Sequence, residues 1–359
     1  MTKNYLTVFI VLMLLSLTAC THLGPKTVPR DRFDYNTAIS TSWKDQTLLN
    51  IVKIRYADFP LFVEVASIVS GYSMESSVNL GSVMTEGSGI NDIFSFGTNG
   101  KFTDRPTITY VPITGQKFNR SFMTPIPPGT ILFLIQSGWQ IDLVFPLAID
   151  TINGFRGGIS SAVNQKSHDS EYDRIIKLLR KIQLSGGIGM KIIKGKDDQE
   201  TTVMFLRQRN VAPEVKALQQ EFESLIGLRP GLKQIELIYG QIPEKDSEIA
   251  ILTRSMIQIM IELALEVSVP PEHISDGRTV SALPRQMDED GKSRKLITIN
   301  SSATKPENSF VSVFYRDHWF WVDDCDFKSK RAFSFLMILF STMETGGKEG
   351  LPLVTIPTG

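Results

Sequence analysis

The chain has 359 residues, of which 42% are hydrophobic, and its 38 basic residues equal its 38 acidic residues in number. This apolar fraction is ample for globular cores, and the length suggests two or three domains. The balanced charge leaves no electrostatic footprint for nucleic acid and argues against a nucleic-acid-binding protein.

The N-terminus has the pattern of a secretory signal. One positive charge at Lys3 precedes an apolar run over residues 5–17, and small residues follow it before glycine and proline appear. The run is too short for a membrane span, which needs about 20 residues.

The segment Leu17-Thr18-Ala19-Cys20 resembles the lipobox of bacterial lipoproteins. The resemblance implies that residues 1–19 are a signal peptide and that Cys20 carries lipid in the mature protein. An ordinary signal peptide with a chance cysteine, or a short N-terminal anchor, is the alternative. Two or three acyl chains on one cysteine would hold the protein on a membrane, since a single chain binds only reversibly.

The residue after Cys20 is Thr21, whereas an Asp there often retains Gram-negative lipoproteins at the inner membrane. For a Gram-negative source this favours the periplasmic face of the outer membrane. Cys325 is the only other cysteine. An intramolecular disulfide is therefore excluded once Cys20 is acylated, and packed cores must supply the stability.

The N-terminal half of the mature chain predicts a tether, a helix and a β-hairpin. Residues 20–32 are polar and contain proline, which suits a tether. Asp34 is placed to cap a helix over residues 35–56, which Pro60 ends. Residues 72–80 alternate with period two, as in a strand with one apolar face. A soft loop over residues 86–101 and a returning strand at 107–111 complete a hairpin from 62 to 111, within a region spanning 33–128.

Two small mixed modules are expected to follow, at residues 129–245 and 246–359. The first contains a short helix or strand at 130–136 and a strand or short helix at 143–152. It continues as a helix at 169–182, strands at 188–193 and 202–206, a helix at 213–226 and a strand at 235–239. The second contains an apolar helix at 248–267, strands at 296–300, 310–315 and 319–322, a helix at 326–343 and a strand at 353–356. The fold class is α+β.

The order helix, strand, strand, helix, strand resembles the ring-building domains of secretion machines, as an analogy at the level of fold. Three further regions together resemble an uncharacterised family of Gram-negative lipoproteins. The resemblance covers most of the mature chain and supplies no catalytic residue. The regions are residues 30–36 with 48–56, residues 107–115, and residues 319–324 with 329–331.

Four groups of residues are weighed as sites, and for each the structural interpretation is favoured. The acidic cluster next to Cys325 suits a metal or acid–base role, but helix capping and surface ion pairs also explain it. An aromatic set suits a binding platform, but packing under the last helix explains it as well. The basic helix face could contact anionic lipid, but a solvent-exposed face is the default interpretation. No metal site, cofactor or catalytic residue is predicted. The groups are Asp323, Asp324 and Asp326 around Cys325; Phe314, Tyr315, Trp319, Phe320 and Trp321; Lys177, Arg180 and Lys181; and the histidines His22, His168, His273 and His318.

Three functions remain open. The first is a non-enzymatic structural or assembly component of an envelope complex, anchored through Cys20, with the 62–111 hairpin touching a neighbouring subunit or the membrane. The second is an envelope hydrolase, which requires His318 within hydrogen-bond reach of Asp323 or Asp324 in a pocket. The third is a ligand-binding lipoprotein with a large apolar cavity between modules.

Overall fold

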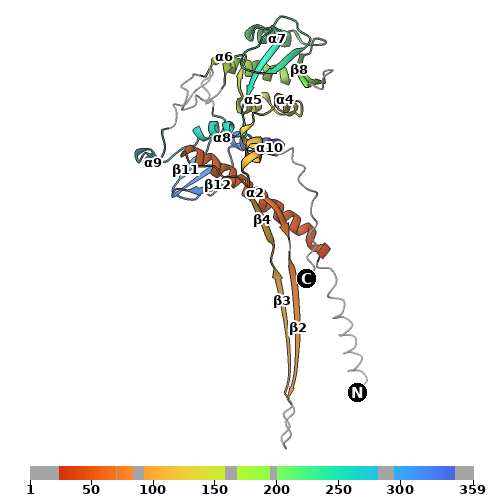
Figure 1. Cartoon of the computed structure of the whole chain (residues 1–359), viewed down its shortest axis with the longest axis vertical. Coiled ribbons are helices and arrows are strands. Elements are labelled where there is room, and N and C mark those ends of the chain that lie inside the picture. Colours follow the sequence, from red (N-terminus) through yellow and green to blue (C-terminus); the bar gives the residue numbers. More distant parts are fainter. Residues whose placement is uncertain are drawn as a thin grey trace, which may run out of the picture.

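The computed structural model describes residues 24–69, 71–83, 93–157, 168–194, 200–281 and 295–343. Cys20, His22 and the strand predicted at 353–356 lie outside these ranges. The α+β class is confirmed, since helices and both parallel and antiparallel strands share the chain. Figure 1 shows a folded body from which a slender β-ribbon projects, with α6 and α7 at the opposite end.

The N-terminal helix α2, Gly24–Arg55, is longer than predicted. The tether expected at 20–32 is wrong for residues 24–32, and Asp34 lies inside the helix instead of capping it. Proline near a helix N-terminus is tolerated because N–H groups of the first turn have no partner in the helix, and Pro29 removes only one further hydrogen bond. The C-terminal part of α2 is anchored in the core, where Leu48, Ile51 and Val52 are fully buried.

The predicted hairpin is confirmed, and it is longer and more regular than expected. Strands β1 and β4 form its proximal part, and β2 and β3 its distal part. The loop expected at 86–101 is wrong from residue 93 onward, because β3 pairs with β2 along its whole length. Cross-strand pairing thus overrides the weak strand propensity of Gly97, Asn99 and Gly100. The strands are β1 Val63–Val69, β2 Tyr72–Val83, β3 Ile93–Asp104 and β4 Thr107–Pro112.

The order helix, strand, strand, helix, strand is confirmed in the middle of the chain. The strands β7, β8 and β9 are consecutive antiparallel neighbours, and α6 and α7 pack together. Gly186 and Gly227, with φ of +67° and +75°, follow the two helices as left-handed residues that end them. The elements are α6 Ser170–Leu184, β7 Ile188–Lys194, β8 Glu200–Leu206, α7 Pro213–Leu225 and β9 Ile235–Tyr239.

The helix predicted at 248–267 is wrong in its first third. Residues Glu248–Thr253 form strand β10, and the helix α8 covers only Met256–Leu265, with Ser255 and Gln258 forming a capping box. β10 lies between β9, to which it is parallel, and β5. A strand buried on both faces reads as a continuous apolar run, which periodicity cannot separate from a buried helix. The predicted domain boundary at 245/246 therefore falls inside one six-stranded sheet of order β6-β5-β10-β9-β8-β7.

Short helices connect the ribbon to this sheet. The segment at 130–136 is helical, and the segment at 143–152 is a helix end followed by a strand. Among the described residues, no helix is both long and apolar enough to cross a membrane. The elements are α3 Gly115–Phe118, the π-helical turn η2 Asn119–Met123, α4 Pro128–Gln136, α5 Ile141–Ala148, β5 Ile149–Ile152 and β6 Phe155–Arg156.

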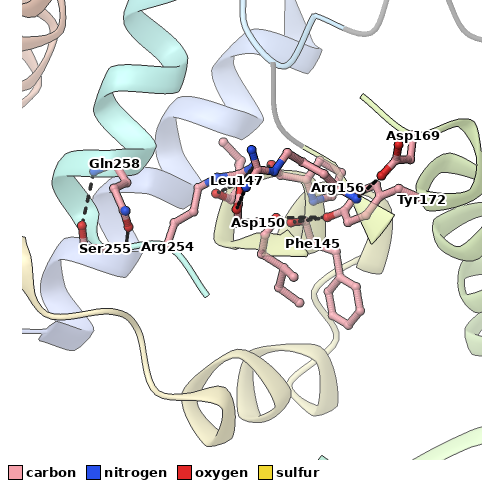
Figure 2. Close-up of polar contacts among 11 residues, drawn as sticks. Phe145, Leu147, Asp150, Arg156, Asp169, Tyr172, Arg254, Ser255 and Gln258 are labelled. Atoms are coloured by element: carbon pink, nitrogen blue, oxygen red, sulfur yellow. Dashed lines mark hydrogen bonds and ion pairs between the residues drawn. The ribbon is translucent and has the colours of Figure 1, made fainter. Parts of the chain in front are cut away.

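Figure 2 shows a polar network around Arg254, Asp150 and Tyr172 that joins several of these elements. The guanidinium of Arg254, which is 3% exposed, donates to the carbonyl oxygens of Pro146 and Leu147 at 2.8 and 3.2 Å and pairs with Asp150 at 3.2 Å. The buried Tyr172 hydroxyl donates to the carbonyl oxygens of Phe145 and Ile149. The network fixes α5 and β5 against α6 and the end of β10.

The C-terminal part forms a second, three-stranded sheet of order β11-β13-β12, which packs against α2 and α10. The strand predicted at 296–300 is displaced: Ile299 forms a single bridge with Val267, and β11 begins at Asn300. The strands at 310–315 and 319–322 and the last helix are confirmed. The elements are α9 Pro271–Ser275, β11 Asn300–Ser302, β12 Ser309–Tyr315, β13 His318–Asp323 and α10 Phe327–Met343.

Candidate functional site

The β-ribbon is the feature that the fold presents most prominently for interaction. Its root is clamped by side-chain amides of α2. Gln46 exchanges two hydrogen bonds with the backbone of Val63, at 2.7 and 3.0 Å, and Asn50 does the same with Leu61, at 3.1 and 2.8 Å. Each amide thus pairs with the chain as a neighbouring strand would.

Aromatic packing and one ion pair complete the root. Phe62, which is 3% exposed, lies 4.0 Å from Phe122 between ring centroids and 6.0 Å from Phe340 of α10. The ammonium of Lys117 pairs with Glu64 at 2.6 Å. The ribbon therefore leaves the body from a packed and hydrogen-bonded base.

The proximal part of the ribbon carries devices that blunt its edges. The β1–β4 register shifts between Val65 and Ser67, which marks a bulge. Pro106 directly precedes β4, and Pro112 is its last residue. Bulges and prolines of this kind discourage a further strand from pairing with an exposed edge.

The distal part lacks these devices. β2 and β3 pair over twelve residues each, without any shift of register between Tyr72–Asp104 and Val83–Ile93. Neither strand contains proline, and every side chain described between residues 73 and 79 and between 97 and 102 is exposed. Each strand consequently presents a long, regular row of backbone N–H and C=O groups to solvent.

The two faces of the distal ribbon differ in composition. Positions on β2 and β3 that are Cα partners share a face, and the faces alternate along each strand. One face carries the pair Glu75–Lys101 together with Ser, Thr, Asn and Gly, and it ends in the apolar pair Val83–Ile93. The other carries no charge at its described strand positions within 74–82 and 94–102. Its apolar positions are Met74, Val78, Leu80, Phe94, Phe96 and Phe102.

The acidic cluster predicted near Cys325 is accounted for by local structure. Asp323 accepts the backbone N–H of Cys325 at 2.7 Å, and Asp324 pairs with Lys330 at 2.6 Å. Asp326 caps α10 by accepting from the N–H and hydroxyl of Ser329, at 3.1 and 2.6 Å. Burial opposes ionisation of Asp326, yet these hydrogen bonds keep its pKa below the ordinary value.

The contact predicted between His318 and Asp323 or Asp324 is not formed. His318 stands at the start of β13 and Asp323 at its end, about 17 Å apart along the strand. The Nε2 atom of His318 instead lies 3.0 Å from Glu272 of α9. Among the described residues, no group of three or more His, Cys, Asp or Glu side chains could hold a metal ion.

The aromatic set of β12 and β13 is divided between core and surface. Phe320 is fully buried, while Phe314 is 54% exposed and packs beside Trp319. Tyr315 and Trp321 are partly buried. Because neighbouring residues of a strand face opposite ways, the set does not form one platform.

The basic face predicted on α6 is partly neutralised. Arg180 pairs with Asp142 at 3.3 Å and donates to Gln183 at 2.8 Å. Lys181 lies on the exposed side of the helix, and Lys177 is half-buried. His168 pairs with Asp173 at 3.0 Å near the N-terminus of the same helix.

Sequence reasoning missed a cluster of titratable rings at the end of α2. The Tyr56 hydroxyl lies 2.6 Å from Nδ1 of His273, whose ring centroid is 4.9 Å from that of His318. Burial raises the pKa of Tyr56 to about 12, and burial together with His318 lowers the pKa of His273. Tyr56 directly follows α2, and the two histidines come from α9 and β13, so no spacing in the sequence marks the cluster.

A cavity of about 240 Å³ lies at the ribbon root. It is smaller than the roughly 300–1,000 Å³ of typical ligand sites. Two of its polar side chains, Gln46 and Glu64, already have partners in the fold. The cavity thus offers weak support for a ligand-binding lipoprotein.

Comparisons with protein-family models, with curated protein sequences and with solved structures find no match.

Proposed function

We propose that this chain is a non-enzymatic structural component of a bacterial envelope complex, anchored by lipid on Cys20, which assembles through its β-ribbon. The observation that carries the proposal is the pair of regular, unprotected edges on β2 and β3. An isolated two-stranded ribbon is at best marginally stable in water, and a partner that pairs with its edges stabilises it. Other envelope proteins or further copies of the chain are the partners, and nucleic acid is not.

The anchor is supported by the sequence Leu17-Thr18-Ala19-Cys20, and Thr21 supports the periplasmic face of the outer membrane. The helix that follows the anchor also clamps the ribbon root through Gln46 and Asn50. Anchor and ribbon are thus attached to one rigid element.

The experiment removes the distal ribbon and leaves the body intact. The N–H of Arg105 donates to the carbonyl oxygen of Gly71 at 2.9 Å, so residues 72–104 can be replaced by an Asn-Gly turn at a point where the strands already meet. Full-length protein extracted in mild detergent is expected to sediment as an oligomer or complex, and the shortened protein as a monomer. A monomeric full-length protein contradicts the proposal.

Two cysteine variants test the anchor in the same extracts. Cys20→Ala is expected to leave the membrane fraction or to accumulate unprocessed. Cys325→Ala is the matched control, because Cys325 is the other cysteine and is exposed, and it should fractionate as the unaltered protein does. Normal membrane localisation of Cys20→Ala refutes lipid anchoring.

A further inference from the structure

The distal ribbon has the residue pattern of a strand pair that separates lipid from water. Within the described strand residues 73–83 and 93–103, its charges, Glu75 and Lys101, are Cα partners and so share one face. The opposite face is made of apolar and small residues, among them Phe94, Phe96 and Phe102. Strands that cross a bilayer alternate in this way, with apolar residues outward and polar residues inward.

The length of the distal ribbon also fits a bilayer. Twelve residues at about 3.3 Å each give a strand of about 40 Å. A strand tilted by about 45° needs about 9–11 residues to cross the hydrocarbon core of roughly 30 Å. β2 and β3 are therefore long enough to cross with a tilt.

The proposed anchor brings the bilayer to the level of this ribbon. Arg30 of α2 lies beside Tyr72 at the start of β2, with Nη2 3.5 Å from the Tyr72 hydroxyl. Figure 1 shows the N-terminal part of α2 beside the ribbon, on the same side of the body. Gly24 lies about 9 Å further along the helix, and four more residues reach Cys20, at most about 14 Å beyond. β2 continues for about 36 Å past Tyr72, so a full crossing requires Cys20 to lie close to the level of Tyr72, which the four residues before Gly24 are long enough to reach.

A single ribbon cannot remain in hydrocarbon, because each of its free edges leaves unpaired N–H and C=O groups at a cost of several kcal/mol apiece. Further copies of the same chain remove both edges. β2 runs away from the body and β3 returns toward it. When anchored copies point the same way, β2 of one copy meets β3 of the next in antiparallel orientation, and a ring of copies closes without an edge.

We infer that the β2–β3 ribbons of several copies pair into a closed antiparallel sheet that crosses the lipid bilayer, with the apolar face toward acyl chains and the polar face lining a water-filled passage for small solutes. This inference rests on the proposed function, since it needs assembly through the ribbon. Beyond the proposed function, it identifies the partner of the ribbon as a second copy of the chain, places the ribbon in lipid, and assigns solute passage as an activity.

Ser76 and Ser77 allow a matched test, because they are adjacent serines on opposite faces of β2. Each is changed to Cys in full-length, lipidated protein carrying Cys325→Ser, labelled with an environment-sensitive fluorophore, and reconstituted in phosphatidylethanolamine–phosphatidylglycerol vesicles. The label at 76 is expected to be quenched by spin-labelled acyl chains and shielded from iodide, and the label at 77 to show the reverse. Equal iodide quenching at both positions overturns the inference.

Dye release tests the passage with a second matched pair. Val78→Arg places a charge on the lipid-facing side, and Ser77→Arg places the same charge on the polar side. Vesicles with unaltered protein or Ser77→Arg should release trapped calcein, and Val78→Arg should reduce release to that of protein-free vesicles. Oligomers that release no dye refute the inference while the proposed function stands, whereas a monomer in detergent refutes both. Equal release by the two arginine variants refutes the lipid-facing assignment.

Discussion

Glu266, at the end of α8, is predicted to make the stability of the body depend on pH in a direction unusual for a carboxylate. The side chain is 4% exposed, and its oxygens accept the N–H groups of Leu296 and Ile297 at 3.0 and 3.3 Å. These hydrogen bonds favour the charged form, but burial outweighs them and raises the pKa of Glu266 to about 7.

The size and sign of this pH dependence follow from the difference in the pKa of Glu266 between the folded and unfolded states. The ordinary value is 4.5, so the folded state holds the proton about 2.5 pH units longer than the unfolded state. At 1.36 kcal/mol per unit this amounts to about 3 kcal/mol. Because the folded pKa is raised, the stabilisation is complete below pH 4.5 and is lost as the pH rises through about 7. Burying the charged carboxylate is the cause of the loss.

Urea denaturation from pH 4.5 to 8.5 measures the effect as a difference between the unaltered protein and Glu266→Gln, which cannot ionise. Relative to the variant, the unaltered protein should lose up to about 3 kcal/mol of unfolding free energy as the pH rises. Glu248→Gln, measured in a series extended down to about pH 3, is the control of opposite sign. The hydrogen bond from Lys245 lowers the pKa of Glu248 below its ordinary value of 4.5, so there the unaltered protein should gain unfolding free energy as the pH rises toward 4.5 and change little above it. A pH-independent difference for Glu266→Gln refutes the reasoning.

Two further substitutions test buried polar contacts by the same denaturation assay. Arg254→Met leaves Asp150 and two carbonyl groups without their buried partner and should lower the free energy of unfolding by about 3–5 kcal/mol. Arg278→Met, the control at an exposed pair with Asp276, should lower it by about 1 kcal/mol or less. Equal losses in the two variants contradict this prediction. Tyr56→Phe removes the 2.6 Å hydrogen bond to the buried His273 and should cost about 1–3 kcal/mol, and an unchanged free energy of unfolding would show that this contact is not formed.

Local patterns in the sequence predicted elements well where one face of a helix or strand is buried. The amphipathic helices α6 and α7 and the strands β9, β12 and β13 lie within two residues of their predicted bounds. β10 was missed because its residues are buried on both faces, which removes the period-two signal. β3 was predicted as a loop because its glycines and Asn99 outweigh its aromatic residues, and only the ladder with β2 identifies it as a strand.

The candidate site could be predicted only in part, for a related reason. The alternation at Tyr72, Met74, Val78 and Leu80 indicates one apolar face, but the second half of that face lies on β3, most of which the sequence predicts as a loop. The clusters that depend on distant segments, such as Tyr56 with His273, carry no local signal because 217 residues separate the partners. Capping of α10 by Asp326 was predictable, since the cap and its partner Ser329 are three residues apart.

The contacts between α2 and the ribbon root explain how a long, thin ribbon can keep a fixed direction relative to the body. Gln46 and Asn50 lie one helical turn apart, and each exchanges two hydrogen bonds with the segment that enters β1. The same helix is buried in the core at Leu48, between these two residues, and at Ile51, directly after them. A tilt of the ribbon about its base must therefore break amide pairs or open the core. The proposed anchor on Cys20 precedes the other end of this helix, so the helix that would carry the membrane attachment also sets the direction of the ribbon relative to the body.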